Sequence, residues 1–169
     1  ETQAIAHVVR CFENEDVAHV AGDVDPTRDI ETINTELLLA DLETVDKALA
    51  KSVKQSKSGD KKLLLTAGFL EQLKIHLDQA QPVRTFTIDD PQNVLPQLHL
   101  LTAKPVLFIA NVDETGFTNN PYLDQVREIA DQSDASVVPI CAAIEAEVSE
   151  LDDADKLEFL QELDLKEPG

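Results

Sequence analysis

Two apolar runs on either side of one amphipathic segment constrain the fold of this chain most. Residues 105–112 (PVLFIANV) and 135–143 (ASVVPICAA) are rich in β-branched residues, as expected for strands buried on both faces of a parallel sheet. The intervening segment has apolar residues at the spacing of one helical face, namely Tyr122, Leu123, Val126, Ile129 and Ala130. A strand, a helix and a strand in this order predict a right-handed crossover and therefore an α/β fold.

Further strands and helices are predicted outside this unit. Residues 4–12 (AIAHVVRCF) have the same apolar character, and residues 16–22 (DVAHVAG) give a weaker strand signal. After the last strand the chain is rich in strong helix formers, up to an aspartate-rich stretch near Asp152. Because aspartate favours the start of a helix, we expect a break there and a second helix from about Asp153 to Leu163.

The middle of the chain carries two heptad-like apolar patterns joined by the polar loop KQSKSGDKK. The first pattern consists of Ile30, Ile33, Leu37, Leu38, Leu42, Val45 and Leu49, and the second of Leu63, Leu70, Leu73, Leu77 and Ala80. They predict an antiparallel helical hairpin, or coiled coil, over residues 25–81, with Asp25 or Thr27 as its N-cap. The hairpin would be inserted between residues 1–24 and 82–169, either as scaffolding or as a partner-binding arm.

The charge of the chain restricts its partners. With 33 acidic against 14 basic residues, the formal net charge is -19, which disfavours wrapping nucleic acid or an anionic membrane. Any phosphate contact must be local, and the one basic stretch is the loop that holds Lys51, Lys54, Lys57, Lys61 and Lys62. The acidity itself has two open explanations, a salt-adapted source or an acidic member of its family.

The cysteines and the hydropathy bear on the compartment. Cys11 and Cys141 lie far apart in apolar stretches without a cysteine or histidine at ligand spacing, so buried reduced thiols are favoured over a disulfide or a metal site. None of the four histidines shows ligand spacing, and no segment reaches the roughly 18 apolar residues of a membrane span. These features favour a cytoplasmic protein, with no metal site in the chain and no membrane partner.

Longer blocks of the sequence resemble one family. The segment HVVRCFENEDVAHVAGDVDPTRDIETINTELLLADLE, the loop NVDE, the helix NNPYLDQVREIA and the segment PICAAIEAEVSELD are similar to the YchF subfamily of Obg-related P-loop GTPases and ATPases. The resemblance implies a Ras-like parallel sheet with helices on both faces, an inserted helical hairpin, and a TGS domain after this chain. It also implies a cytoplasmic protein that hydrolyses ATP or GTP with Mg²⁺ and associates with ribosomes, on the large subunit. Residues 1–24 and 82–169 would then be part of the nucleotide-binding domain.

The phosphate-binding motifs of such proteins are absent from this sequence. None of the five glycines is followed by Lys-Ser or Lys-Thr, so there is no G-x-x-x-x-G-K-[ST] loop. We therefore expect no catalytic residue in this chain, Mg²⁺ ligands outside it, and no turnover by the 169 residues alone. The chain reads as a piece of a longer protein.

The motif that would read the base is present in altered form. In a Ras-like GTPase, N-K-x-D pairs its aspartate with two parallel donors of guanine. Here Asn111 is followed by Val112 in place of lysine, and Glu114 replaces the aspartate. The extra methylene moves the carboxylate by roughly an ångström, which disturbs a bidentate pair whose atoms must lie about 2.9 Å apart. We predict a weakened guanine preference and competent or preferred ATP binding, with Asn111 tethering the loop and Val112 supplying backbone groups and an apolar surface.

Four further positions complete the predicted base site. The S-A-K motif of such GTPases corresponds to Cys141, Ala142 and Ala143, whose backbone N–H groups can serve in spite of the altered side chains. Phe12 is either a core aromatic or an apolar wall against the purine. Arg10 is either a structural ion pair or a switch-region contact.

Three functions remain open at this point. The first is an ATP or GTP hydrolase of the YchF type. The second is a non-enzymatic interaction module that docks through its helical arm. The third is a GTP-dependent protein that binds nucleic acid directly through the lysine-rich loop, from Lys51 to Lys62.

Overall fold

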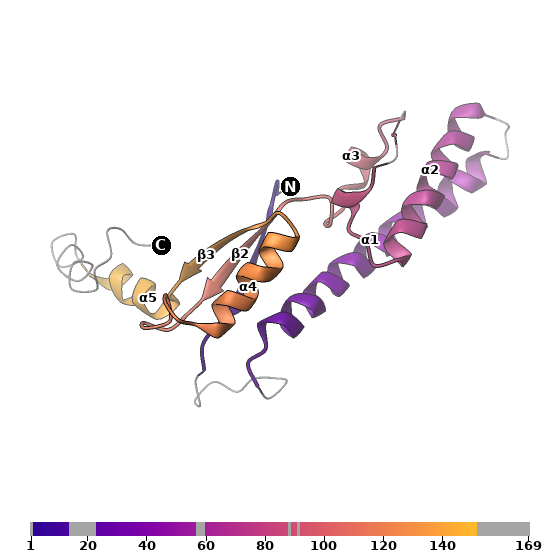
Figure 1. The fold of residues 1–169 in the computed structure, drawn as a ribbon. Helices are drawn as coiled ribbons and strands as arrows, with labels where there is room; N and C mark the ends of the chain where they lie inside the picture. The colour runs from indigo at the N-terminus through magenta and orange to yellow at the C-terminus, as the bar shows by residue number, and fades with distance from the viewer. Residues whose placement is uncertain (1, 14–22, 57–59, 88, 91, 152–169) are drawn as a thin grey trace. The chain divides into compact units, whose positions relative to one another are not determined.

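The computed structural model describes residues 2–13, 23–56, 60–87, 89–90 and 92–151 (Figure 1). The elements are, in chain order, β1 (Ile5–Arg10), α1 (Pro26–Ser56), α2 (Lys61–Asp78), η1 (Val83–Thr85), α3 (Leu95–Leu98), β2 (Val106–Asn111), α4 (Pro121–Gln132), β3 (Ser136–Ile140) and α5 (Ala142–Glu150). They form two compact units. We call Ala6–Ile30 with Val106–Gly169 the sheet unit, and Glu1–Ile5 with Glu31–Pro105 the hairpin unit.

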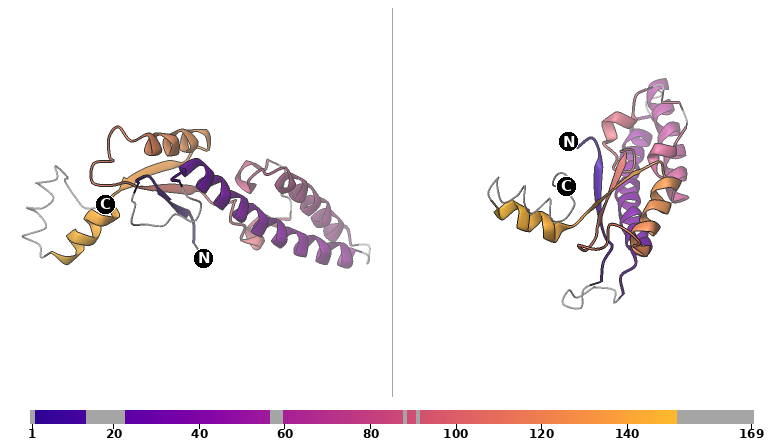
Figure 2. Two further views of the ribbon diagram at one scale, coloured as in Figure 1. Left: turned by 90° about the horizontal axis from the view of Figure 1, so that it is seen from below. Right: turned by 60° about the vertical axis from the view of Figure 1, so that its left-hand side comes forward.

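The sheet is parallel and has the order β1-β2-β3 (Figure 2). Leu107 lies opposite Ser136 and Asn111 opposite Ile140, while the Cys11 N–H donates to the Asn111 carbonyl oxygen at 2.7 Å. This arrangement confirms the predicted α/β class. The third strand ends at Ile140, earlier than the predicted residue 143, because α5 begins at Ala142.

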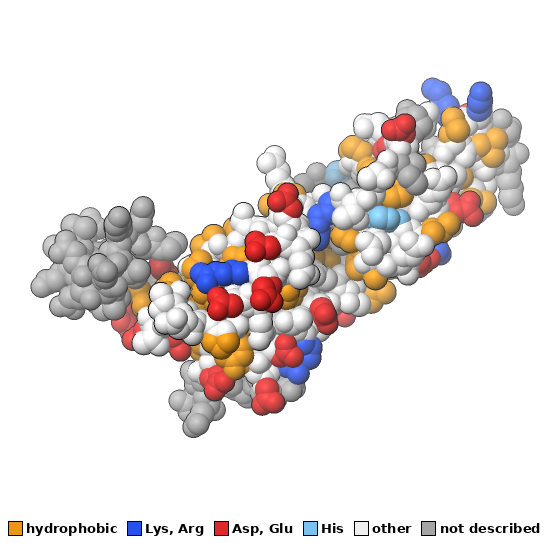
Figure 3. Space-filling model, viewed as in Figure 1, with side chains coloured by type: hydrophobic (Ala, Val, Ile, Leu, Met, Phe, Trp, Pro, Cys, Tyr) orange, Lys and Arg blue, Asp and Glu red, His pale blue; other side chains and the backbone are white. Residues whose placement is uncertain are grey.

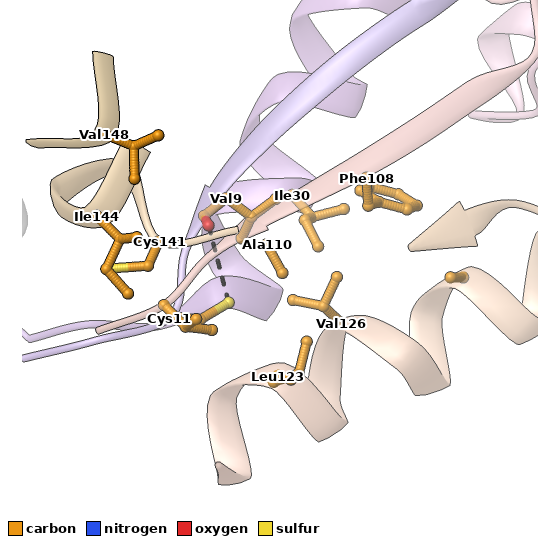
Figure 4. Packing of buried hydrophobic residues seen from close by; sticks show 12 residues of the cluster. Val9, Cys11, Ile30, Phe108, Ala110, Leu123, Val126, Cys141, Ile144 and Val148 are labelled. Carbon is orange, nitrogen blue, oxygen red and sulfur yellow. Dashed lines mark hydrogen bonds between the residues drawn. The ribbon is translucent and has the colours of Figure 1, made fainter. Parts of the chain in front are cut away.

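The core of the sheet unit combines side chains of the sheet, of α4, which packs on β2 and β3, of α5 and of the start of α1 (Figure 2). Figure 4 shows its buried side chains, among them Val9 from β1, Phe108 and Ala110 from β2, and Val126 from α4. In β1 the burial alternates, so that the Val9 side chain is 2% exposed and the Val8 side chain 62%. The strand therefore buries one of its faces, as the period of two in a strand requires.

The predicted amphipathic helix is α4. It begins after Asn120, whose side-chain oxygen accepts from the N–H groups of Tyr122 and Leu123, and Pro121 occupies its first turn. Proline is well tolerated there because the first N–H groups of a helix have no partner within it. The helix buries Leu123, Val126 and Ala130, which are three of the five residues expected on that face.

The hairpin unit has a core of its own. Its buried residues are Val45 from α1, Phe69, Leu70, Leu73 and Leu77 from α2, and Val83, Val94 and Leu100 from the segment that follows. Asp25 caps α1 by accepting from the Arg28 N–H at 3.1 Å, so of the two predicted caps Asp25 is the one used. Ala80 was expected on the seam, which is wrong, because α2 ends at Asp78 and the exposed Ala80 has a φ of 58°.

One buried carboxylate connects distant parts of the hairpin unit. Asp41 of α1 is 2% exposed and accepts from the Leu101 N–H, the Thr102 N–H and the Thr102 hydroxyl, each at 2.7 Å. The Thr102 hydroxyl in turn accepts from the Val83 N–H at 2.9 Å. The segment after α2 is thus held against α1 by hydrogen bonds as well as by apolar contact.

Some predictions fall outside the described residues. These are the weak strand at 16–22, the second C-terminal helix and the middle of the lysine-rich loop, residues 57–59. The coiled-coil character of the hairpin and the division into domains at residues 24 and 81 stay predictions. Within the described part of the chain, no helix is long and apolar enough to cross a bilayer.

Candidate functional site

A pocket of about 420 Å³ lies in the sheet unit, where the chain leaves each of the three strands. Open α/β sheets bind ligands at this carboxyl edge. The residues that line it are Phe12, Glu13, Asn111, Val112, Asp113, Glu114, Thr115, Cys141, Ala142 and Ala143. All seven residues predicted for the base site are among them, brought together from three loops that are up to 131 positions apart (143 minus 12). The sequence prediction did not include Glu13, Asp113 or Thr115 in this site.

The end of β2 is tied to the start of α5. The Asn111 side-chain oxygen accepts from the Ala142 N–H at 3.1 Å, and the Val112 N–H donates to the Ile140 carbonyl at 2.8 Å. Val112 is 1% exposed and belongs to the core. The two loops that face each other across the pocket are therefore fixed to one another by a side chain and by the backbone.

The loop after Val112 folds into a tight turn. The Asp113 carboxylate accepts from the Thr115 N–H at 3.1 Å and from its hydroxyl at 3.2 Å, and the Asp113 carbonyl accepts from the Gly116 N–H at 3.0 Å. This Asx turn occupies the carboxylate of Asp113 locally. In the described part of the chain, nothing hydrogen-bonds or ion-pairs with the exposed Glu114 carboxylate. Both neighbouring acids line the pocket, and the turn uses one carboxylate oxygen of Asp113, whereas the Glu114 carboxylate has both oxygens open to a ligand.

Phe12 forms an apolar wall of the pocket and is half-buried. The Arg10 guanidinium carbon lies 4.9 Å from the centre of the Phe12 ring, and the Arg10 Nε donates to the Phe12 carbonyl at 3.0 Å. A cation over an aromatic face is attracted by the ring's electrons. Arg10 therefore holds the aromatic ring, a role that neither sequence interpretation of this residue included.

The third wall is the start of α5. Cys141 is its N-cap residue and is 2% exposed, and exposed Ala142 and Ala143 form the first helical positions. The first N–H groups of a helix lack intrahelical partners and can donate to other groups. Both cysteines are buried, as expected, and burial raises the pKa of the Cys11 thiol to about 11. Cys11 is therefore an inert core thiol at neutral pH.

The rim of the pocket carries a hydrogen bond between two elements. The Tyr122 hydroxyl of α4 donates to the Glu13 carboxylate at 2.5 Å, and this hydrogen bond raises the pKa of Tyr122. Both side chains are near the solvent. The interaction holds the backbone after Phe12 close to α4.

Asn120 contacts three segments around the pocket although it does not line it. Its amide nitrogen donates to the Cys11 carbonyl at 2.8 Å and to the Gly116 carbonyl at 3.1 Å, while its oxygen caps α4. The sequence signal Asn-Pro before an amphipathic segment indicates the cap. The two contacts of the amide nitrogen have no local signal, because Cys11 is 109 residues away.

The described residues do not fit a magnesium site. They include no group of three or more His, Cys, Asp or Glu side chains placed to hold a metal ion. Of the three carboxylates that line the pocket, Asp113 hydrogen-bonds within the Asx turn and Glu13 accepts from Tyr122, which leaves Glu114 as a single acid. The site can hold an aromatic ring between Phe12 and two polar loops, and it offers no built place for a metal.

The parallel sheet and the pocket at its carboxyl edge define the class, which is an α/β protein with the P-loop NTPase arrangement. The particular relatives are YchF proteins. The whole chain is 52% identical to "Ribosome-binding ATPase YchF" of Haemophilus ducreyi, 51% to that of Escherichia coli O157:H7 and 42% to that of Bacillus subtilis. The chain is homologous to the YchF proteins along its entire length, which confirms the resemblance found in the sequence.

A solved structure agrees with this result. The YchF GTPase of Schizosaccharomyces pombe matches 97% of this chain with a TM-score of 0.81 and 29% sequence identity. This chain spans about half of the length of these relatives, 47% of the bacterial proteins and 46% of the S. pombe chain. No family model matches the sequence.

Proposed function

We propose that this chain supplies the base-binding part of a YchF-type nucleotide hydrolase that takes ATP in preference to GTP. The observation that carries the proposal is the convergence of Phe12, the Asn111–Glu114 loop and the start of α5 on one pocket. The homology along the whole chain supports the same reading. The division into a nucleotide-binding domain (1–24 and 82–169) and an inserted hairpin (25–81) is part of the proposal.

The proposed preference for ATP rests on the acid at the end of the loop. Guanine presents two parallel donors, which an aspartate accepts as a pair, whereas adenine presents one donor beside a ring acceptor that repels a carboxylate. Glu114 is one methylene longer than that aspartate, and Asp113 is occupied by its turn. In our proposal the purine packs against Phe12. The Val112 carbonyl and the other backbone groups of the Cys141–Ala143 segment meet the adenine edge, because the Val112 N–H donates to Ile140 and the Ala142 N–H to Asn111, which keeps the two loops together.

The names of the relatives differ on the nucleotide. The bacterial proteins are called ATPases and the S. pombe protein a GTPase, and each name applies to that protein. For this protein, the preference is tested by titration with ATP and with GTP. In a protein of the relatives' full length that contains this chain, Glu114→Asp should shift the ratio of ATP to GTP affinity toward GTP by about tenfold. Glu128→Asp, an exposed change of the same kind on α4, is the matched control. An unchanged ratio in the Glu114 variant would rule out base reading by this loop.

Hydrolysis would require groups that this sequence lacks. We propose that the phosphates and their Mg²⁺ are bound by residues outside this chain, since the phosphate-loop motif is absent here. The 169-residue chain should therefore release no phosphate from ATP or GTP, whereas a protein of the relatives' length should. Turnover by this chain alone would refute the assignment of the catalytic groups. A full-length protein without turnover would favour the non-enzymatic interaction module.

Ribosome association is the second part of the proposal, and the tip of the hairpin is the surface offered for it. Lys51, Lys54, Lys61 and Lys62 are exposed there, and Figure 3 shows basic side chains at that end and many acidic ones on the sheet unit. Exposed Val53, Leu64 and Leu65 lie in the same stretch of the two helices. We propose that this tip contacts RNA of the large subunit, in a cytoplasmic protein, because its exposed lysines give phosphates a local excess of positive charge.

A matched pair of double variants tests this surface. Lys61→Gln with Lys62→Gln removes two charges at the tip, and Lys47→Gln with Lys74→Gln removes two from paired, solvent-facing positions on the two helices. The tip variant should weaken binding to purified large subunits and lower the slope of log K against log salt by about 0.7 to 0.9 for each phosphate that is no longer neutralised. Equal effects of the two double variants would indicate that binding depends on the net charge of the protein rather than on a specific interaction at the tip.

A further inference from the structure

We propose that Asn120 is a positioning residue for nucleotide binding, which holds the Phe12 wall and the Asn111–Gly116 loop at the separation that a purine requires. This inference rests on the proposed function, because it gives a role in base binding to a side chain that does not line the pocket. The observation behind it is that one buried amide joins both walls to the rigid start of α4.

The two N–H groups of the Asn120 amide are divided between the two walls. One contact reaches the carbonyl of Cys11, the residue directly before Phe12, at 2.8 Å, and the other reaches the carbonyl of Gly116 at 3.1 Å. Asn120 is only 9% exposed, so water cannot readily replace either of these hydrogen bonds. The backbone before the aromatic wall and the backbone after the base-reading loop are therefore fixed to a single group.

The oxygen of the same amide is fixed to the most rigid part of the unit. It accepts from the Tyr122 N–H at 3.0 Å and the Leu123 N–H at 3.3 Å. Leu123 and Val126 of α4 are fully buried in the core, where Figure 4 shows them below the sheet with Cys11 nearby. Because the helix cannot move without disturbing this core, the Asn120 amide holds both walls in a fixed position relative to α4.

Gly116 completes this arrangement. A Cβ at position 116 would lie 2.9 Å from the Asn120 amide nitrogen, 2.8 Å from an Asp113 carboxylate oxygen and 3.1 Å from the Val112 Cβ. Real Cβ atoms do not approach other atoms as closely as the first two distances. The loop can therefore come near enough for its carbonyl to accept from Asn120 only without a side chain at this position. Gly116 and Asn120 act as one unit.

A helix cap alone would not need this side chain. Serine and aspartate cap helices about as well as asparagine, but neither can donate to the two carbonyls as the amide does. Asn120→Ser keeps a cap oxygen and replaces the two amide N–H donors by one hydroxyl on a shorter side chain, and Asn120→Asp keeps the cap and places an acceptor against two acceptors. These variants therefore separate the positioning role from the role in starting α4.

The test measures equilibrium binding of ATP, GTP and inorganic tripolyphosphate, each with Mg²⁺, to a full-length protein that contains this chain. Tripolyphosphate carries the phosphates without a base. Asn120→Ser should weaken ATP binding by about tenfold and change tripolyphosphate binding by less than about twofold, since only the base site is disturbed. Asn120→Asp should weaken ATP binding at least as much.

Val126→Ala is the matched control. It destabilises the same helix by removing core volume, and its side chain does not line the pocket. It should leave both affinities unchanged at a temperature where every variant is folded. A parallel loss of ATP and tripolyphosphate binding in Asn120→Ser, or the same loss in Val126→Ala, would reduce Asn120 to a structural cap and overturn the inference.

Two further variants distinguish this inference from the proposed function. Asn111→Ala and Glu114→Asp alter the proposed base site directly. If they change ATP or GTP binding while Asn120→Ser does not, the positioning role is wrong and the base site stands. If wild type binds ATP no more tightly than tripolyphosphate, and none of the variants changes this, the base-binding function itself fails.

Discussion

Each of the two units of this chain contains a buried polar side chain that connects distant segments, but the two side chains have different roles. In each, one buried polar side chain connects backbone segments that are far apart in sequence, Asp41 in the hairpin unit and Asn120 in the sheet unit. Asp41 only accepts, and its three donors come from one short segment, Leu101 and Thr102. Asn120 donates and accepts, and it joins three segments around a pocket. A carboxylate suits a role in holding one segment, whereas an amide can join several.

The comparison also shows what each side chain can affect. The Asp41 contacts lie among the residues of the hairpin core, and the pocket has no residue from that unit. Loss of Asp41 should therefore change stability without changing the base site. Loss of Asn120 should change both. Four predictions test this contrast, in order of decreasing effect.

Removing the buried carboxylate should have the largest effect. Asp41→Ala leaves the buried N–H and hydroxyl of Thr102 and the part-buried N–H of Leu101 without their acceptor, which should lower the free energy of unfolding by about 3 kcal/mol. Urea denaturation of the 169-residue chain measures this change. Asp46→Ala, which removes a partly exposed carboxylate paired with Lys74, should cost only about 0.5 kcal/mol. A similar cost for both would mean that burial does not set the value of Asp41.

Truncating the amide in the sheet unit should cost somewhat less. Asn120→Ala removes the cap of α4 and leaves two carbonyls without their donor, with an expected loss of about 2 kcal/mol in the free energy of unfolding. Asn120→Ser should recover about half of this loss through its hydroxyl cap. Full recovery by serine would show that the contacts to Cys11 and Gly116 add no stability.

Most of the long helices and strands were predictable from the sequence because they depend on local residue patterns. The strand, helix and strand unit follows from periodicity, and Asp25 was one of two residues expected to cap α1. The same reasoning extended α2 to Ala80, because apolar spacing does not reveal a backbone that turns to positive φ two residues after the helix ends. The short elements η1 and α3 have too few residues for any periodic signal.

The connecting side chains could not be predicted for a different reason. Asp41 stands three residues after Leu38 and four before Val45, so the helical pattern places it beside the seam. Only the fold brings Leu101 and Thr102 to it from 60 residues away or more. Seven of the ten residues that line the pocket were accessible from the motifs, since the motifs lie at the carboxyl ends of strands. Their supports, Asn120 and Arg10, depend on contacts that no local sequence rule contains.

A side chain at Gly116 should disturb the sheet unit alone. In Gly116→Ala the new Cβ would crowd the Asp113 carboxylate and the Asn120 amide, so the turn must shift, at an expected cost of about 1 to 2 kcal/mol. Urea denaturation checks the cost, and ATP binding by the full-length protein should weaken as in Asn120→Ser. Gly68→Ala in α2 is the control, because nothing lies within 4 Å of its Cβ position and alanine favours helices. It should leave ATP binding unchanged and stability equal or higher.

The smallest effect is expected from a change of pH, which should alter the free energy of unfolding through His7 of the sheet unit. His7 of β1 packs against Phe108 with ring centres 5.6 Å apart, and burial lowers its pKa below 6.5, with Asp29 partly opposing the shift. The folded state therefore binds this proton less readily than the unfolded state. As the pH falls below 6.5, the unfolded chain takes up the proton first, so the free energy of unfolding should decrease until the folded pKa is also passed.

Between pH 7.5 and 5.5, about one unit on either side of the ordinary histidine pKa, urea denaturation should show this loss for wild type. His7→Phe, which keeps an aromatic ring against Phe108, should show a smaller loss. An identical pH dependence for His7→Phe and wild type would mean that the burial of His7 does not couple protons to the stability of the sheet unit.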